Sequence, residues 1–147
     1  MKATKKQRIL KIINQTKNHA YLATSDNGQP IIRSMTPIVE DNLSIWLATF
    51  NSSRKVKQIK KNPKICLAFI SQPNGDKTAI VLGKAKIVKN LREKQRIWKL
   101  ANYDMSQYFK NGPTDTEFCL LKIIINKIEW WDNWQTGRQI YIPSKTK

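Results

Sequence analysis

A strand pattern that gives way to a basic helix pattern and then returns constrains the fold of this sequence more than any other feature. Leu43–Ala48 and Ile65–Ile70 are apolar runs of strand length. Between them the apolar residues Val56 and Ile59 stand three positions apart, which is the spacing of one helical face. We therefore predict two strands separated by a short helix.

The predicted helix begins with residue types that suit a phosphate group. Ser53 can accept a hydrogen bond from a free amide of the first turn, and Pro63 ends the helix because the residue before a proline avoids helical dihedrals. Arg54 and Lys55 add a guanidinium and an ammonium at the positive end of the helix dipole. A phosphate cradle and a solvated basic helix with an ordinary serine cap are both consistent with these residues.

The remaining pattern predicts a mostly β chain with helices (α+β), organised as a small antiparallel barrel in one domain, residues 1–147. Asn27-Gly28 predicts a hairpin turn, and Gly83 predicts a bend within a long strand. A tight turn is predicted at Asn126, and a parallel crossover at 43–70 stays possible. Besides the segment at 43–70, the predicted helices are 5–16 and 91–103, and the predicted strands are 20–24, 30–39, 78–88, 117–125 and 127–131.

The net charge of +17 points to anionic partners without identifying one. A nucleic acid, an anionic ligand and a lysine-rich proteome are all consistent with it. The sequence has no zinc-finger spacing and no RNA-binding aromatic motif, so nucleic-acid binding is expected to be non-specific at most. No apolar run approaches the roughly 20 residues of a membrane span and no signal core follows the basic start, so we expect a cytoplasmic protein without membrane association.

The residues that usually carry catalysis are sparse in this chain. Asp and Glu together number 10, and His19 is the one histidine, so no catalytic triad is indicated. No metal-ligand spacing, Walker loop or dinucleotide fingerprint occurs, so no metal site is predicted and the catalytic residues stay unknown. An enzyme of this composition would take its reactive group from a bound cofactor. Arg33 lies within a predicted strand, where solvent exposure is favoured and a ligand contact is the alternative.

Several motifs occur together in an order that is similar to one known family. Thr49-x-x-x-Ser53-Arg54-Lys55-Val56, followed by Asn62-Pro63 and a strand, resembles the core motif of the pyridoxamine 5′-phosphate oxidase-like, FMN-binding split-barrel proteins. More narrowly, the chain is similar to the general stress protein branch. Further matches along nearly the whole chain are Gly83-Lys84-Ala85, Tyr108-Phe109-x-x-Gly112-Pro-x-Asp115 and Glu129-Trp130-Trp131-Asp132.

The resemblance implies a six-stranded antiparallel split barrel, and a homodimer that binds flavin mononucleotide (FMN) at the interface between its subunits. Carried over by position, the residues that hold the FMN phosphate would be Ser53, Arg54 and Lys55. Arg33, Ser34, Met35 and Thr36 would run along the flavin edge, and Ala48 and Thr49 would contact the ring or the phosphate end. Trp131 would pack near the flavin of the partner subunit, and Thr78 stands where relatives often have a glutamine.

The resemblance also implies flavin-dependent redox activity, although one segment of this chain departs from the family pattern. True pyridoxamine phosphate oxidases grip substrate with an Arg-x-His-x-Arg segment, whereas the comparable segment here, Arg138–Ile142, lacks histidine. We therefore expect an FMN-binding, flavin-dependent oxidoreductase of unknown substrate, and the oxidation of pyridoxamine phosphate is not carried over to this chain. The alternatives are a flavin-binding or stress-response protein without turnover and, third, a basic nucleic-acid-binding barrel.

Overall fold

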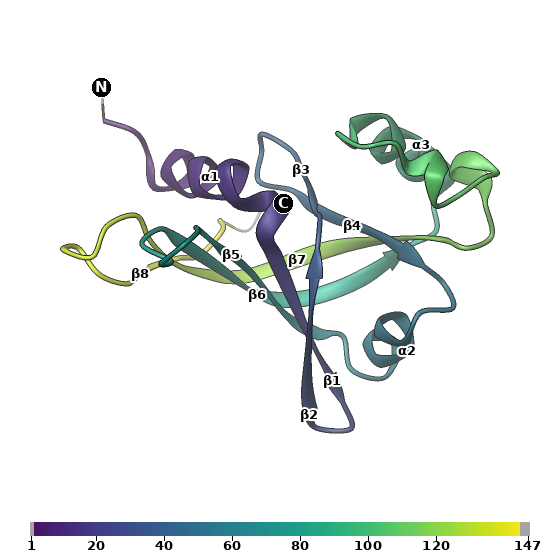
Figure 1. Cartoon of the computed structure of the whole chain (residues 1–147), viewed down its shortest axis with the longest axis horizontal. Helices are drawn as coiled ribbons and strands as arrows, with labels where there is room; N and C mark the ends of the chain where they lie inside the picture. The colour runs from purple at the N-terminus through teal and green to yellow at the C-terminus, as the bar shows by residue number, and fades with distance from the viewer. Residues whose placement is uncertain (1, 145–147) are drawn as a thin grey trace.

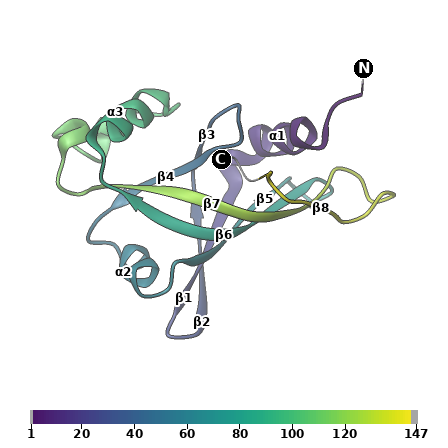
Figure 2. The same cartoon turned by 180° about the vertical axis from the view of Figure 1, so that it is seen from behind.

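The computed structural model describes residues 2–144 and shows one antiparallel sheet curled into a half-barrel, with three α-helices around it (Figure 1). The strand order is β2-β1-β5-β6-β7-β4-β3, and β8 pairs with β7 (Figure 2). The helices are α1 (Lys5–Thr16), α2 (Arg54–Lys61) and α3 (Leu91–Leu100), with short 3-10 turns η1 (Lys17–His19), η2 (Met105–Gln107) and η3 (Gly112–Thr114). The strands are β1 (Ala20–Asp26), β2 (Gln29–Met35), β3 (Ile38–Val39), β4 (Ile45–Phe50), β5 (Lys64–Ile70), β6 (Thr78–Val88), β7 (Phe118–Trp131) and β8 (Gln139–Tyr141).

The predicted α+β class and split barrel are confirmed, but the prediction of six strands is wrong. The sheet has eight strands in residues 2–144. One reason is the predicted strand 30–39, which breaks between Met35 and Ile38 at Pro37, a residue with no backbone N–H to donate. The other is β8, a three-residue strand that the sequence did not reveal.

The predicted turn at Asn126 is also wrong, because β7 runs through it as one strand. Leu82 pairs with Lys127 while Gly83 pairs with Ile125, so Asn126 is the extra residue of a β-bulge. A Cβ atom at Gly83 would lie 2.0 Å from the carbonyl oxygen of Ile124. Glycine is therefore required where the two strands approach at the bulge, as the bend predicted at Gly83 suggested.

Residues 43–70 fold as a strand, a short helix and a strand, as predicted, and they do not form a parallel crossover. β4 pairs with β3 and β7, whereas β5 pairs with β1 and β6, and every pairing is antiparallel. The Ser53 hydroxyl caps α2 by accepting from the amide of Val56. Val56 and Ile59 are buried in the main core, so α2 is held against the open side of the half-barrel.

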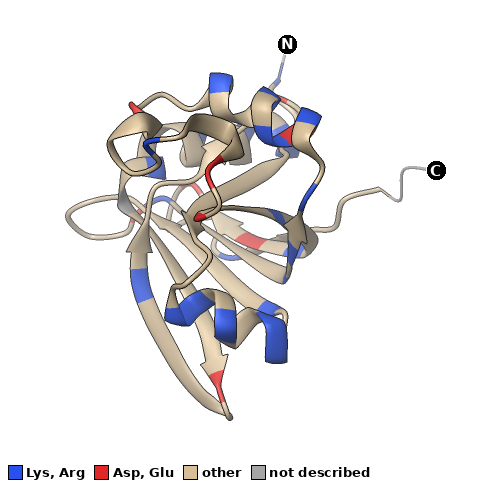
Figure 3. Cartoon of the chain, turned by 90° about the vertical axis from the view of Figure 1, so that its right-hand side faces the viewer, with Lys and Arg blue, Asp and Glu red and all other residues tan. Residues whose placement is uncertain are grey.

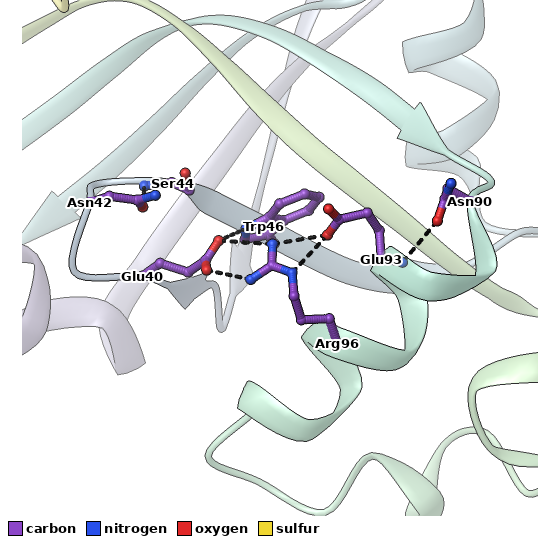
Figure 4. Close-up of polar contacts among 7 residues, drawn as sticks. All are labelled: Glu40, Asn42, Ser44, Trp46, Asn90, Glu93 and Arg96. Atoms are coloured by element: carbon purple, nitrogen blue, oxygen red, sulfur yellow. Dashed lines mark hydrogen bonds and ion pairs between the residues drawn. The ribbon is translucent and has the colours of Figure 1, made fainter.

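A second, smaller core joins α3 to the outer face of the sheet. Ile97 of α3 packs there with Trp46 and Phe118. Figure 4 shows Glu40 accepting hydrogen bonds from Arg96 of α3 and from the Trp46 indole, which ties the helix to β3 and β4. In residues 2–144 no helix is long and apolar enough to span a membrane.

Candidate functional site

A cavity of about 640 Å³ lies between the sheet, α2 and the segment that follows α3. Its volume falls within the roughly 300–1,000 Å³ typical of small-molecule sites. Six of the predicted site residues line it, from β2, the residue that follows it, β4 and the first turn of α2: Ser34, Met35, Thr36, Ala48, Thr49 and Lys55. The fold therefore brings most of the predicted site into one place.

Lys55 is the charged centre of this cavity. Its side chain is half-buried, and its Nζ atom donates to the Thr49 Oγ1 atom at 2.8 Å. Burial and then the nearby Arg33 guanidinium lower the pKa of Lys55 from its ordinary value. Among residues 2–144 Lys55 forms no ion pair with a carboxylate. A half-buried ammonium without a counter-charge suits an anionic ligand.

Arg33 turns inward rather than toward solvent, so the solvent-facing interpretation of the sequence is wrong. Its guanidinium donates to the Thr24 hydroxyl at 2.8 Å and to the Gln58 side-chain oxygen at 3.1 Å. Burial and then Arg54 lower the pKa of Arg33. Arg33 is thus a half-buried neighbour of the cavity that ties β1 and β2 to α2, and it is not among the residues lining the cavity.

Ser53 and Arg54 flank Lys55 but do not line the cavity with it. Ser53 uses its hydroxyl oxygen to cap α2, and its O–H remains a donor at the helix N-terminus. Arg54 is exposed and lines a neighbouring groove of about 210 Å³ with the β1–β2 turn. Three cations, Arg33, Arg54 and Lys55, still surround one helix start.

The sequence did not reveal the opposite wall of the cavity. It is built by one residue of η1, one of β4 and four from the segment after α3: Asn18, Phe50, Asn102, Tyr103, Tyr108 and Phe109. The Phe50 and Phe109 rings lie 5.0 Å apart, and burial raises the pKa of Tyr103. One sequence feature could have indicated this wall: the irregular, polar stretch 104–115, which contains an aromatic pair. Loops on a rigid scaffold often carry binding residues.

Thr78 and Trp131 lie elsewhere in the same chain. They face each other in the register of β6 and β7, and both donate to the Gly75 carbonyl oxygen at 3.0 Å. Neither lines the cavity. Figures 1 and 2 both place the β8 end of the sheet, where β7 ends, away from α2 and α3. The predicted site residues therefore form two separate groups within one chain.

A family model described as pyridoxamine 5′-phosphate oxidase like matches residues 4–146. The chain belongs to this family. It is 32% identical over 120 residues to General stress protein 26 of Bacillus subtilis strain 168, a match that covers 80% of this chain and 81% of that protein. The resemblance to the pyridoxamine 5′-phosphate oxidase-like family and its general stress protein branch is thereby confirmed.

Solved structures share the fold of this family member at lower identity. General Stress Protein 26 from Bacillus anthracis strain Sterne superimposes with a TM-score of 0.76 at 24% identity, covering 94% of this chain and 98% of that one. A heme binding protein from Mycobacterium smegmatis gives 0.77 at 12% identity, covering 97% of this chain and 59% of that one. At these identities the comparison shows the fold alone.

Proposed function

We propose that this chain is a flavoprotein that binds FMN in the 640 Å³ cavity. The observation that carries the proposal is Lys55, a half-buried cation at a helix N-terminus that has no carboxylate in an ion pair with it among residues 2–144. A phosphate monoester supplies the missing negative charge. Free amides of the first turn and the Ser53 hydroxyl can also donate to it.

Each residue around Lys55 has a different proposed role in binding FMN. Thr49 holds the Lys55 ammonium toward the cavity, and Arg33 keeps α2 joined to β1 and β2 through Gln58. Arg54, on the groove side of the helix start, adds long-range positive charge. The flavin edge would lie along β2 and the residue after it, where Ser34 and Thr36 are exposed and Met35 offers a polarisable apolar surface.

The outer face of the sheet supports a homodimer. From β1 to β6 its rows in register are apolar and partly exposed in the single chain, as the pairings Tyr21–Ala68–Ile80 and Ala23–Cys66–Leu82 show, and on β7 they end at charged residues. Ile32, opposite Ala23, is 68% exposed. A contiguous apolar face of this kind is typical of a protein–protein contact. We infer that two copies pack through it.

Such a dimer would join the two groups of predicted site residues. Trp131 and Thr78 lie on this outer face, in the same row of the sheet as Ile70 of β5. Ser34 is on the outer face of β2, because it pairs with Tyr21, and it lines the cavity. A partner subunit packed on this face can therefore bring its Trp131 to the cavity opening, with the buried Thr78 behind that ring.

The chemistry proposed for the site is that of a flavin-dependent oxidoreductase. FMN supplies two-electron redox chemistry when it is bound, and the chain supplies binding, orientation and shielding from water. Among the lining residues whose side chains the structure describes, none is Asp or Glu, and the titratable ones are Lys55, Tyr103 and Tyr108. The redox partner is not identified by these residues. A protein that binds flavin without turnover is the alternative.

The first experiment is the flavin absorbance of the untreated protein, followed by titration of the apoprotein with FMN. We expect Lys55→Ala to weaken FMN binding by about 10- to 100-fold, from the loss of a charge-assisted bond of roughly 1.5–3 kcal/mol. Arg54→Ala should have a smaller effect, because Arg54 faces the neighbouring groove. Lys57→Ala, an exposed lysine on the same helix, is the control for lost charge.

Equal affinity of the Lys55→Ala variant and the wild type would remove the phosphate assignment. A protein that binds hemin in place of FMN would refute the flavin proposal and extend the heme-binding property of the Mycobacterium smegmatis neighbour to this chain. Bound FMN that neither NADH nor NADPH reduces would favour the alternative without turnover.

A further inference from the structure

Four lysines lie together on the outer face of three neighbouring strands. Lys64 of β5 is directly opposite Lys84 of β6, and Lys86 of β6 is directly opposite Lys122 of β7. Directly opposite residues of an antiparallel pair share a face, and Lys84 and Lys86 share it because side chains alternate along a strand. Ala85 between them points into the main core. The four residues, named here the lysine face, therefore point away from that core.

The chain leaves much of the charge of the lysine face unneutralised, although Lys122 lies near enough to Glu40 to help lower the pKa of that carboxyl group. Like charges directly opposite each other destabilise a sheet. Within residues 2–144 none of the four lysines forms an ion pair with a carboxylate. Glu129 is on the same face of β7 but is already paired with Lys127 and Arg138. An external anion would convert this repulsion into attraction.

The C-terminal end of α2 extends the lysine face. The Ala85 amide donates to the Pro63 carbonyl oxygen at 2.9 Å, which holds the end of the helix segment beside β6. Lys60 and Lys61 are exposed there. Figure 3 shows Lys and Arg bands along α2, a helix that contains no acidic residue. The C-terminal end of α2 thus adds exposed positive charge a few residues before Lys64 in the chain.

The arrangement suits a long polyanion better than a small one. Lys64, Lys84 and Lys86 are exposed on an open sheet face. Neighbouring strands are about 4.8 Å apart, and residues two apart along a strand are separated by about 6.8 Å. Evenly repeated point charges of this kind match a ligand that carries repeated negative charges. Lysine is also a compact point charge on a flexible stem, without the rigid planar fork of arginine.

The neighbouring α3 helps to identify the polyanion. Trp46, opposite Lys122, is buried beneath α3, and the Lys122 ammonium lies 5.2 Å from the Trp46 ring centroid. The helix therefore rises from the sheet beside the lysine face (Figure 1). A planar bilayer would be held off by that helix, whereas a single extended strand or a rod can lie alongside it.

We propose that the lysine face binds the phosphodiester backbone of a nucleic acid without reading its sequence. The surface adjoins the apolar dimer face at Leu82, two residues before Lys84. Burying unpaired lysines between two copies would be costly, so the lysine face stays at the border of the dimer contact. The proposal does not depend on FMN, because none of the four lysines lines the cavity.

The test is fluorescence anisotropy with a labelled mixed-sequence duplex of about 20 base pairs, measured across about 50–200 mM NaCl. We expect Lys84→Gln/Lys86→Gln to reduce the slope of log affinity against log salt by about 1.8, since each phosphate contact contributes about 0.9. The control is Lys5→Gln/Lys11→Gln on α1, which removes two exposed lysines and changes the net charge equally. The control should keep the wild-type slope, and both doubles should keep wild-type FMN affinity.

Three outcomes would overturn the proposal. The two double variants could lose the same slope, which would mean that net charge alone acts. The duplex and a single-stranded oligonucleotide of the same length could both fail to bind the wild type at about 50 mM salt. Phosphatidylserine vesicles could bind where DNA does not. The thermal midpoint is the independent readout, and Lys84→Gln/Lys86→Gln should raise it by relieving the opposed charges.

Discussion

The two groups of predicted site residues differ in how complete they are within one chain. The α2 group, Lys55, Thr49 and the β2 residues, surrounds a cavity and is held by a hydrogen bond between Lys55 and Thr49. The β7 group, Thr78 and Trp131, shares one carbonyl partner but borders no part of that cavity. The two groups lie apart within one chain, and the proposed dimer would bring them together in a site between two subunits.

The largest effect is expected from Gly83→Ala, because both groups depend on the β6–β7 ladder. The new Cβ atom would lie 2.0 Å from the Ile124 carbonyl oxygen, so the bulge must open. We expect a loss of about 3 kcal/mol in the free energy of unfolding, measured by urea denaturation. Gly28→Ala, in open space at a positive φ, should cost only about 1 kcal/mol. An equal cost for both variants would contradict the role of the bulge.

The next effect is expected from Leu82→Lys on the apolar outer face. A charge there should dissociate the proposed dimer and thereby weaken FMN binding by about tenfold or more, although the cavity itself is unchanged. Light scattering and FMN titration measure the two consequences. Gln95→Lys, an exposed position on α3, adds the same charge and should change neither. A Leu82→Lys monomer with wild-type FMN affinity would show that the two groups act independently.

A smaller effect is expected from Trp131→Ala. Loss of one aromatic contact with the flavin should weaken FMN binding by about 0.5–1.5 kcal/mol, that is, by several-fold. Trp134 is 66% exposed and its ring lies 6.2 Å from that of Trp131, so Trp134→Ala serves as the control. If the two variants bind FMN equally well, Trp131 does not contact the flavin.

The smallest effect concerns Glu40, which anchors α3 and so the aromatic wall of the cavity. The hydrogen bond from Arg96, and then that from Trp46, lowers the pKa of Glu40. A depressed carboxyl pKa gives stability that is present above the unfolded value of about 4.3 and is lost as the pH falls through the folded value. Glu40→Gln should therefore destabilise by about 0.5–1 kcal/mol at neutral pH and by less near pH 3. Denaturation at both pH values checks this, and a pH-independent difference would contradict it.

Local signals predicted the parts of this molecule that depend on local chemistry. The Ser53 cap, the buried Val56 and Ile59, and the turn at Asn27-Gly28 follow from spacing and backbone preference, and the structure has all of them. The bulge at Asn126 was mistaken for a turn, because a polar residue between two strand patterns does not show whether the chain reverses. Whether the chain reverses or continues at such a residue depends on how the strand pairs with its neighbour.

The site was predictable to the extent that its residues follow one another in the chain. Of the cavity lining, Lys55 and the run Ser34–Thr36 were among the predicted residues, whereas Asn18 and Tyr103 were not, because only the tertiary fold places them at the cavity. The inward turn of Arg33 depends on Thr24 and Gln58, which lie 9 and 25 residues away. Such partners are visible only once the sheet and α2 have been assembled.

The most direct test of the account is a mixing experiment with Lys55→Ala and Trp131→Ala chains, each of which carries one defect in a different group. If each flavin site takes Lys55 from one subunit and Trp131 from the other, a mixed dimer contains one intact site and one site with both defects. After unfolding and refolding together at equal concentration, about a quarter of all sites should bind FMN with wild-type affinity. A mixture with no site tighter than those of the two parent variants would contradict the account.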